Sequence, residues 1–144
     1  MPNESQMWRD HVQPVLKTAR LDPWRIENSV RIGTPDVNYI HGWIELKSLA
    51  GWPKREGTSV SIPHFTPQQR VVLERRHRLG GHAWLLLRVS KEFLLFRGDL
   101  AALHIGVASR AGLETICQAY SPKGFDPSVF LPILTTPRFN HNIR

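Results

Sequence analysis

The sequence has very little cysteine and no long apolar run, and each shortage excludes a class of protein. Among its 144 residues there is one cysteine, Cys117, so no internal disulfide can form. A single cysteine fits a reducing compartment, and we expect a cytoplasmic location. No apolar run approaches the roughly 20 residues of a membrane-spanning helix. The polar residues at the N-terminus do not have the pattern of a signal peptide. We therefore expect no membrane partner.

Sequence motifs typical of two large classes of binding site are also missing. The seven histidines do not have the spacing of a zinc site, and one cysteine excludes a cysteine-rich zinc finger. Gly80-Gly81 is not followed by the Lys-Ser or Lys-Thr pair that a phosphate-binding loop requires. No internal repeat is visible.

The chain carries an excess of positive charge. Nineteen lysines and arginines stand against twelve aspartates and glutamates, which gives a net charge of +7. This excess suits a polyanionic partner such as nucleic acid, although the charge alone is equally compatible with a basic protein that binds none. Hydrophobic residues make up 41% of the chain, which is enough for one core, and the length favours a single domain.

The most informative segment is residues 33–47, where a Pro-Asp pair precedes a short turn and an apolar run that contains Glu-Leu-Lys. Strand residues two apart point to the same face, so Glu45 and Lys47 should share a face of the sheet. His41-Gly42 can turn the chain back, which would bring Asp36 close to Glu45. Two carboxylates and an ammonium group at a sheet edge could bind Mg²⁺ and stabilise negative charge on a phosphate.

Each of these three residues also has an ordinary structural interpretation. Aspartate after proline is common in turns, so Asp36 could be a turn residue. Glu45 lies in an apolar run, where a charge is costly unless it is paired or binds a metal, and a salt bridge to Lys47 would satisfy it. Lys47 could extend to solvent from the end of the strand. The combination of the three favours a catalytic site.

Hydrophobic periodicity, capping residues and glycines predict the remaining elements. Asn3 is a predicted N-cap, and Pro14 should kink or break the helix that follows it. Thr66-Pro67 should begin a helix that Gly80-Gly81 ends. The expected helices cover residues 3–19, 66–79, 99–104 and 113–120, and the expected strands cover residues 24–30, 36–40, 43–49, 82–89 and 93–97, with a short extended piece over residues 59–62. The sum is an α/β domain whose mixed central sheet of about five strands is flanked by helices.

The domain is expected to cover residues 1–120. The segment 121–144 contains four prolines and ends in basic residues. We expect an irregular tail that packs on the domain surface or extends from it toward a partner.

The pattern P-D-x(8)-E-L-K, formed by Pro35, Asp36 and residues 45–47, resembles the signature of the PD-(D/E)XK nuclease superfamily. The preceding R-I-E-N and the following F-T-P-Q-Q-R are similar to sequences in its virus-type replication-repair nuclease and Holliday-junction-resolvase branches. The resemblance covers residues 4–89, and it includes the order of the helices and strands. It implies a restriction-endonuclease-like fold with the site on one edge of the central sheet.

The resemblance also implies roles for the residues of this pattern. Asp36 and Glu45 would be ligands of Mg²⁺, for which Mn²⁺ could substitute, and the Leu46 carbonyl would be a further ligand. Lys47 would orient or help deprotonate the attacking water and offset charge on the phosphate.

Two assignments stay open at this point. The resemblance implies a third acid, which either Glu4 in the first helix or Glu27 before the Pro-Asp pair could supply, and Glu4 fits better in placement. A glutamate in a first turn also stabilises a helix N-terminus, and Glu27 could instead pair with a neighbouring arginine. Gln69 lies three residues after Thr66, so it could point toward the site, as in the family, or close a T-x-x-Q capping box.

Basic side chains predict a DNA-binding surface on one helix and the loop before it. The helix over residues 66–79 carries four arginines against one glutamate, and the loop adds a lysine and an arginine. The predicted phosphate-binding residues are Lys54, Arg55, Arg70, Arg75, Arg76 and Arg78. A solvated helix face is the alternative interpretation.

The residues and the resemblance together predict a Mg²⁺-dependent, structure-selective DNA endonuclease. The resemblance implies a Holliday junction resolvase that cuts branched DNA as a homodimer, in the cytoplasm of the host cell if a phage encodes it. Two alternatives stay open: a nicking or flap-processing repair nuclease of the same superfamily, and a DNA-binding module without catalysis.

Overall fold

The computed structural model describes residues 3–27 and 31–138. Within these ranges, six strands form one mixed sheet in which the spatial order is the order of the chain. The strands are β1 (Trp24–Arg25), β2 (Val37–Tyr39), β3 (Gly42–Leu49), β4 (His82–Val89), β5 (Glu92–Arg97) and β6 (Ala119–Ser121). Only β3 and β4 pair in parallel, and every other neighbouring pair is antiparallel. The predicted α/β class is confirmed, with six strands in place of about five.

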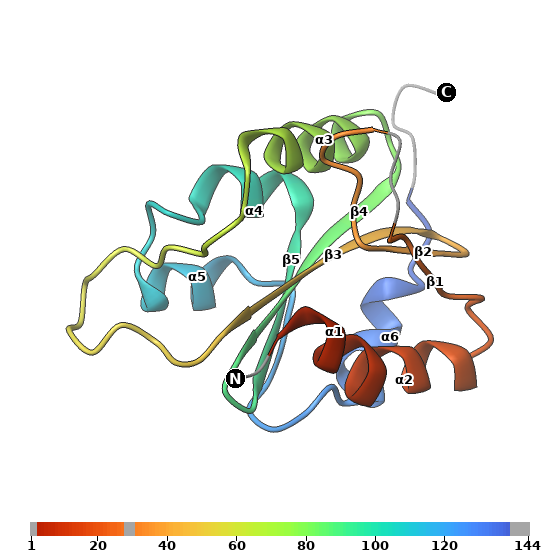
Figure 1. Cartoon of the computed structure of the whole chain (residues 1–144), viewed down its shortest axis with the longest axis horizontal. Helices are drawn as coiled ribbons and strands as arrows, with labels where there is room; N and C mark the ends of the chain where they lie inside the picture. Colours follow the sequence, from red (N-terminus) through yellow and green to blue (C-terminus); the bar gives the residue numbers. More distant parts are fainter. Residues whose placement is uncertain (1–2, 28–30, 139–144) are drawn as a thin grey trace.

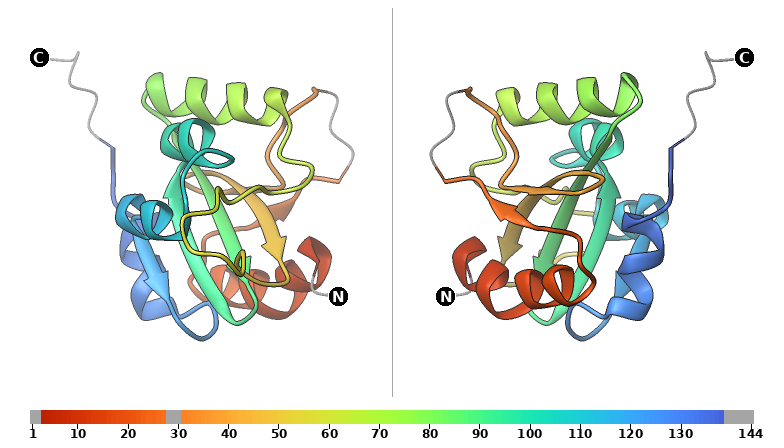
Figure 2. Two further views of the ribbon diagram at one scale, coloured as in Figure 1. Left: turned by 90° about the vertical axis from the view of Figure 1, so that its left-hand side faces the viewer. Right: turned by 90° about the vertical axis from the view of Figure 1, so that its right-hand side faces the viewer.

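Helices cover both faces of this sheet, as Figures 1 and 2 show. The helical segments are α1 (Glu4–Met7), η1 (Trp8–Val12), α2 (Gln13–Thr18), α3 (Pro67–Arg78), α4 (Gly98–His104), α5 (Arg110–Ile116) and α6 (Pro127–Leu134). In Figure 1, α3 and α4 lie above the sheet, whereas α1, α2 and α6 lie below it.

Two hydrophobic cores fill the space between the sheet and these two layers. Side chains alternate between the faces of a strand, so Ile44 and Leu46 of β3 join the core that α1, α2 and α6 complete. Leu85 and Leu87 of β4 join the other core, together with Leu73 of α3. The continuous apolar run of residues 82–89 is explained by this arrangement, because β4 is buried on both faces.

The N-terminal helix follows the prediction, with one local change of helix type. The Asn3 side chain caps it by accepting a hydrogen bond of 2.8 Å from the backbone N–H of Gln6. Before Pro14, the segment Trp8–Val12 forms a wider π-helical turn, and the helix then continues to Thr18. Proline lacks an N–H donor, so a disturbance in the turn before it is expected.

The β2–β3 hairpin and the crossover from β3 to β4 are the parts of the fold that position the candidate site. Tyr39 pairs with Gly42, so the two turn residues are Ile40 and His41, in place of the predicted His41-Gly42. Gly42 is instead the first residue of β3, where a Cβ atom would collide with the His82 carbonyl of β4. After β3, the chain returns through α3, and Gly80 ends the crossover helix with a φ of +97°.

The prediction of an irregular tail was wrong over residues 127–134, which form α6. The segment from residue 121 to residue 138 belongs to the domain, because β6 includes Ser121 and α6 buries Phe130 and Leu134 in the core. The Tyr39 hydroxyl donates a 2.7 Å hydrogen bond to the Leu134 carbonyl and so ties α6 to the hairpin. Asp126 caps α6 through a hydrogen bond from the Ser128 N–H. Two of the prolines that suggested an irregular tail therefore lie in a short helix: Pro127 is its first residue, and Pro132 lies inside it.

Other boundaries differ less. The first strand is limited to Trp24–Arg25, and residues 28–30 of its predicted range lie outside the described residues. The last predicted helix, 113–120, is found at Arg110–Ile116, and the extended piece near residue 60 forms a single bridge between Ser59 and Ser109. No helix in the described ranges is long and apolar enough to cross a membrane.

Candidate active site

Strand β3 presents two charged side chains to the face of the sheet that α3 covers. Glu45 pairs with Leu85 and Lys47 with Leu87, so both share a face with the apolar side chains of that core. The Glu45 side chain is 2% exposed and the Lys47 side chain is 4% exposed. Charged groups are rarely buried this deeply unless they are paired or bind an ion. The shared face was predicted from the spacing of the two residues.

Asp36 faces Glu45 across the hairpin. The pairing of Val37 with Ile44 continues by one step to place Asp36 opposite Glu45, on the same side of the sheet. At this step the strand pairing changes, because the Asp36 carboxylate itself accepts a 2.8 Å hydrogen bond from the Leu46 N–H. The Asp36 carbonyl accepts a 2.7 Å hydrogen bond from the Ile26 N–H, which fixes the backbone. The predicted convergence of the two acids is therefore present.

Lys47 is held in place by both a carboxylate and a backbone carbonyl. Its Nζ lies 3.5 Å from Oε2 of Glu45 and donates a 3.0 Å hydrogen bond to the carbonyl of His64. The same Nζ lies 5.7 Å from the centre of the Phe65 ring. His64 adopts a φ of +66°, an uncommon conformation for a residue other than glycine. The loop before α3 therefore fixes the direction in which the Lys47 ammonium points.

The Glu45 carboxyl group is not fully satisfied by this arrangement. Its Oε1 atom is buried and has no hydrogen-bond partner among the described residues. Burial, followed by the charge of the nearby Asp36, raises the pKa of Glu45 to about 9, although Lys47 acts in the opposite direction. These surroundings favour the protonated form of Glu45 over the ionised form.

These groups fit a divalent cation. In a strand, the N–H and the C=O of one residue point to the same edge, and the Leu46 N–H points to Asp36. The Leu46 carbonyl therefore faces the same edge as the two acids, which gives three oxygen donors of the type that Mg²⁺ and Mn²⁺ prefer. A cation beside Glu45 would favour its ionised form and occupy the unpartnered Oε1.

The third acid that the resemblance implies is not part of this arrangement. Among residues 3–27 and 31–138, no group of three or more histidine, cysteine, aspartate and glutamate side chains could hold a metal ion. Glu4 begins α1, which packs through Met7 on the opposite face of the sheet from Glu45. Glu27 is exposed, next to residues outside the described ranges. Asp36 and Glu45 thus form a pair of acids.

The sequence left two roles open for Gln69, and the structure shows the one in which it caps the helix. Its Oε1 accepts a 3.0 Å hydrogen bond from the Thr66 N–H, and its own N–H donates a 3.2 Å hydrogen bond to the Thr66 hydroxyl. The capping box is complete at the start of α3. The assignment of Gln69 to the catalytic set therefore has no support in this geometry.

The four arginines of α3 have different environments. Arg70 donates to the carbonyls of Ala102 and Ile105 at 2.9 and 2.8 Å, and its guanidinium lies 4.2 Å from the centre of the Phe65 ring. It joins α3 to the end of α4, so its proposed contact with DNA is replaced by a structural role. Arg78 pairs with Glu74 at 3.1 Å on the exposed face of the helix.

The other two arginines of α3 could still bind a phosphate, as the sequence predicted. Within the described residues, no hydrogen bond or ion pair engages the guanidinium groups of Arg75 and Arg76. Both line a small hollow beside Pro35.

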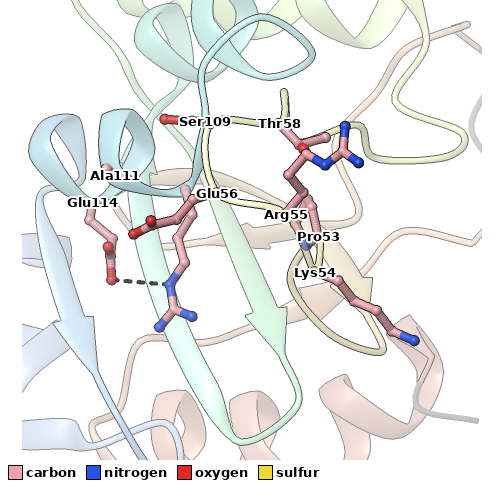
Figure 3. A pocket seen from close by; sticks show the side chains of 10 residues that line it. Pro53, Lys54, Arg55, Glu56, Thr58, Ser109, Ala111 and Glu114 are labelled. Carbon is pink, nitrogen blue, oxygen red and sulfur yellow. Dashed lines mark ion pairs between the residues drawn. The ribbon is translucent and has the colours of Figure 1, made fainter.

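Lys54 and Arg55 belong to the loop between β3 and α3, and the yellow first part of this loop lies at the left of Figure 1, away from α3. They line a cavity of about 350 Å³ between this loop and the start of α5. Figure 3 shows both side chains pointing away from Glu114, which pairs with Arg110 at 3.5 Å. These two cations are thus available to a ligand at the rim of the cavity.

Sequence reasoning missed two features of the site. The His64 carbonyl that holds Lys47 is a backbone group, so its residue type gives no signal. The hollow beside Pro35 is lined in part by Arg31 and Trp43, which the spacing of the motif did not connect. Trp43 could have been found, because it lies two residues before Glu45 and therefore on the same face of β3.

Comparison with known proteins adds no assignment. No family model matches this sequence, and no curated protein does either.

Proposed function

We propose that this chain is a metal-dependent endodeoxyribonuclease of the PD-(D/E)XK type. The observation that carries the proposal is the position of Asp36 opposite Glu45, with the Lys47 ammonium 3.5 Å from Glu45. All three side chains lie on one face of the sheet at the β2–β3 hairpin.

A purely structural role explains this arrangement poorly. A buried polar atom without a partner costs free energy, and Oε1 of Glu45 is such an atom. An ion pair between Glu45 and Lys47 alone would place the two charges in an apolar core, where well-packed hydrophobic residues are often as stable. If Glu45 were ionised in such a pair, the neighbouring Asp36 would add repulsion to this cost. A site that binds a cation and a phosphate uses all these groups.

Asp36, Glu45 and the Leu46 carbonyl would hold Mg²⁺, and Mn²⁺ would substitute for it. When bound, the ion would supply Lewis-acid chemistry, which lowers the pKa of a coordinated water and offsets charge on the phosphate. The Leu46 N–H keeps the Asp36 carboxylate in position at 2.8 Å.

Lys47 has a separate task in the proposed reaction. An ammonium group has three N–H donors. One donor of Lys47 is directed at Glu45, and another is directed at the His64 carbonyl. The third is available for a phosphate oxygen or for the attacking water. In the reaction, the water oxygen forms a bond to phosphorus, the bond from phosphorus to the 3′ oxygen breaks, and a 3′-hydroxyl leaves with a proton.

The substrate is proposed to be branched DNA, most specifically a four-way junction cut by a homodimer. This part rests on the resemblance of residues 4–89 to resolvase-like nucleases and on the net charge of +7. A nicking or flap-processing nuclease would use the same residues on a different branch of DNA.

A DNA-binding module without catalysis is a second candidate, and one observation favours it. The candidate site contains a pair of acids in place of the three that the resemblance implies. Mg²⁺ is often bound by one or two carboxylates together with phosphate oxygens of the substrate, so a pair does not exclude catalysis. A cleavage assay separates the two candidates.

The test compares cleavage with binding. Asp36→Asn and Glu45→Gln each remove a negative charge with little change of shape, so they should abolish Mg²⁺-dependent cleavage and leave DNA binding largely intact. Glu56→Gln, in the exposed loop after β3, is the matched control and should cleave like the wild type. Four-way junction, flap, nicked and linear DNA are incubated with each protein in Mg²⁺ and in EDTA. Wild-type turnover in either site variant would reject the assignment.

A further inference from the structure

A small hollow of about 50 Å³ lies between α3 and the segment that leads into Asp36. One wall is formed by residues 31–35, and the other by Arg75 and Arg76 from the last turns of α3. Trp43 of β3 lines it as well. The hollow is therefore built from three segments that are distant in the sequence.

Its lining carries charge of one sign. Three arginines, Arg31, Arg75 and Arg76, are among the residues that line the hollow, and no aspartate or glutamate of the described residues is. Guanidinium groups bind phosphate oxygens through paired hydrogen bonds. Arg75 and Arg76, whose guanidinium groups engage no hydrogen bond or ion pair within the described residues, create a positive potential at the hollow that favours an anion.

The size of the hollow restricts the ligand. Sites for nucleobases and other drug-sized molecules usually have volumes of roughly 300–1,000 Å³. A volume of about 50 Å³ is far below this range and suits a single compact anion. Phosphate is the compact anion that a nucleic acid offers.

The shape of the hollow is held by close packing between its two walls. Gly33 has a φ of +87°, and a Cβ atom at this position would lie 2.6 Å from the Gln68 carbonyl. The segment is also folded on itself, because the Thr34 hydroxyl donates a 2.7 Å hydrogen bond to the Arg31 carbonyl. Only glycine permits this approach of the segment to α3. These two contacts fix the shape of the wall.

The hollow adjoins the candidate active site. Pro35, which lines it, is the residue before Asp36, and Trp43 lies two residues before Glu45 on the same face of β3. Two residues along a strand span about 7 Å. An anion in the hollow would thus lie about one nucleotide away from a phosphate held at Asp36 and Glu45.

We propose that this hollow binds a phosphate group of the nucleic-acid strand, immediately next to the phosphate that is cut. The placement next to the cut rests on the proposed function, whereas the phosphate site itself does not. The ligand is either the internal phosphodiester that neighbours the scissile one or a terminal 5′-phosphate. Arg75 and Arg76 hold the phosphate, and the Gly33 segment forms the opposite wall.

The first experiment tests the phosphate site without any need for cleavage. Inorganic phosphate is titrated into the protein in EDTA at constant ionic strength, and the indole N–H resonance of Trp43 is followed by NMR, assigned with Trp43→Phe. We expect a saturable shift in the wild type that the double variant Arg75→Gln/Arg76→Gln loses. Arg78→Gln is the matched control, because Arg78 is in the same turns of α3 but pairs with Glu74 and does not line the hollow. A Trp43 resonance that phosphate leaves unchanged, or shifts equally in the double variant, overturns the proposal.

The second experiment distinguishes the two sources of phosphate. Binding of short oligonucleotides is measured in EDTA by fluorescence anisotropy, with a 5′-phosphate, with a 5′-hydroxyl, and with single uncharged methylphosphonate linkages. We expect one such change to weaken binding about tenfold in the wild type and in Arg78→Gln, and to have no effect in the double variant. Loss with the 5′-hydroxyl identifies a terminal phosphate, and loss with one methylphosphonate identifies an internal one. If no change acts through Arg75 and Arg76, the proposal is wrong, whereas cleavage by the intact protein would still support the nuclease.

Discussion

At the scale of single residues, Glu45 determines how the candidate site responds to pH and to a cation. It is buried beside a second acid, and among the described residues the positive charge that pairs with it is that of Lys47. Its ionised form is therefore unfavourable in the free protein, and a bound cation would make it favourable. Two measurements can separate these states.

The first measurement is the pH dependence of stability. The pKa of Glu45 is raised from 4.5 to about 9 on folding, so between these values the folded state holds a proton that the unfolded state has released. The stabilisation is complete below about pH 4.5 and decreases as the pH rises toward 9. Gln at position 45 cannot titrate. In EDTA, thermal unfolding should therefore show Glu45→Gln gaining stability relative to the wild type between about pH 5 and about pH 8. A difference that is constant with pH would contradict the raised pKa.

The second measurement is stabilisation by Mg²⁺. A ligand that binds only the folded state stabilises it by about 2.7 kcal/mol at a free concentration of about 100 times Kd. At slightly alkaline pH, Mg²⁺ and Mn²⁺ should raise the unfolding temperature of the wild type, whereas Asp36→Asn and Glu45→Gln should show little change. Glu56→Gln should respond like the wild type. Equal stabilisation of all four proteins would place the cation elsewhere.

At the scale of elements, the site depends on a hairpin and on the helix that follows it. The register of β2 and β3 sets Asp36 opposite Glu45, and the close contact at Gly33 places the segment before Asp36 against α3. The cap of α3 is part of this support, because Thr66 follows directly after the loop that holds Lys47. The capping box can be tested separately from catalysis.

The test uses two substitutions of Gln69. Gln69→Glu keeps an acceptor for the Thr66 N–H, so the capping box should survive with near wild-type stability and cleavage. Gln69→Ala removes this acceptor and should cost about 1 kcal/mol of stability, with cleavage retained below the unfolding temperature. Urea unfolding and the junction cleavage assay measure the two effects. Loss of cleavage in a stable Gln69→Glu protein would return Gln69 to the catalytic set.

Elements with strong local signals could be predicted from the sequence. Strand β4 and helix α3 were found within one residue, because a continuous apolar run and a cap with Pro67 are local patterns. Helix α6 was missed, although Asp126-Pro127 is a cap followed by proline at the first helical position. Its other prolines favoured an irregular tail, and only packing against the core stabilises so short a helix.

In the candidate site, too, the features that follow from local patterns could be predicted and those that depend on long-range contacts could not. Asp36, Glu45 and Lys47 follow from strand periodicity and a hairpin, which are local rules. The hydrogen bond from Lys47 to His64 depends on the path of a loop. The hollow between Arg31 and Arg76 depends on the approach of two distant segments. Arg70 shows the opposite error, because the sequence could not reveal that the end of α4 would occupy its donors.

At the scale of the whole molecule, charge should govern binding to DNA. The net charge of +7 and the cations of α3 and the loop before it suit a polyanion of any sequence, because phosphate contacts carry no base information. In the proposed function, selectivity would then come from the shape of the DNA, and a four-way junction has a shape that two symmetric subunits can match.

The last prediction follows from this symmetry. One chain contains one candidate site, whereas resolving a four-way junction requires two cuts, so the protein should be a homodimer in solution. It should bind a four-way junction far more tightly than a linear duplex of equal length, and in Mg²⁺ it should place paired nicks symmetrically across the junction, with none in EDTA. Sedimentation tests the dimer, and strand-specific end-labelling tests the symmetry. A monomer that nicks linear duplex as readily as junctions would reject the resolvase and favour a nicking repair nuclease that uses the same Asp36, Glu45 and Lys47.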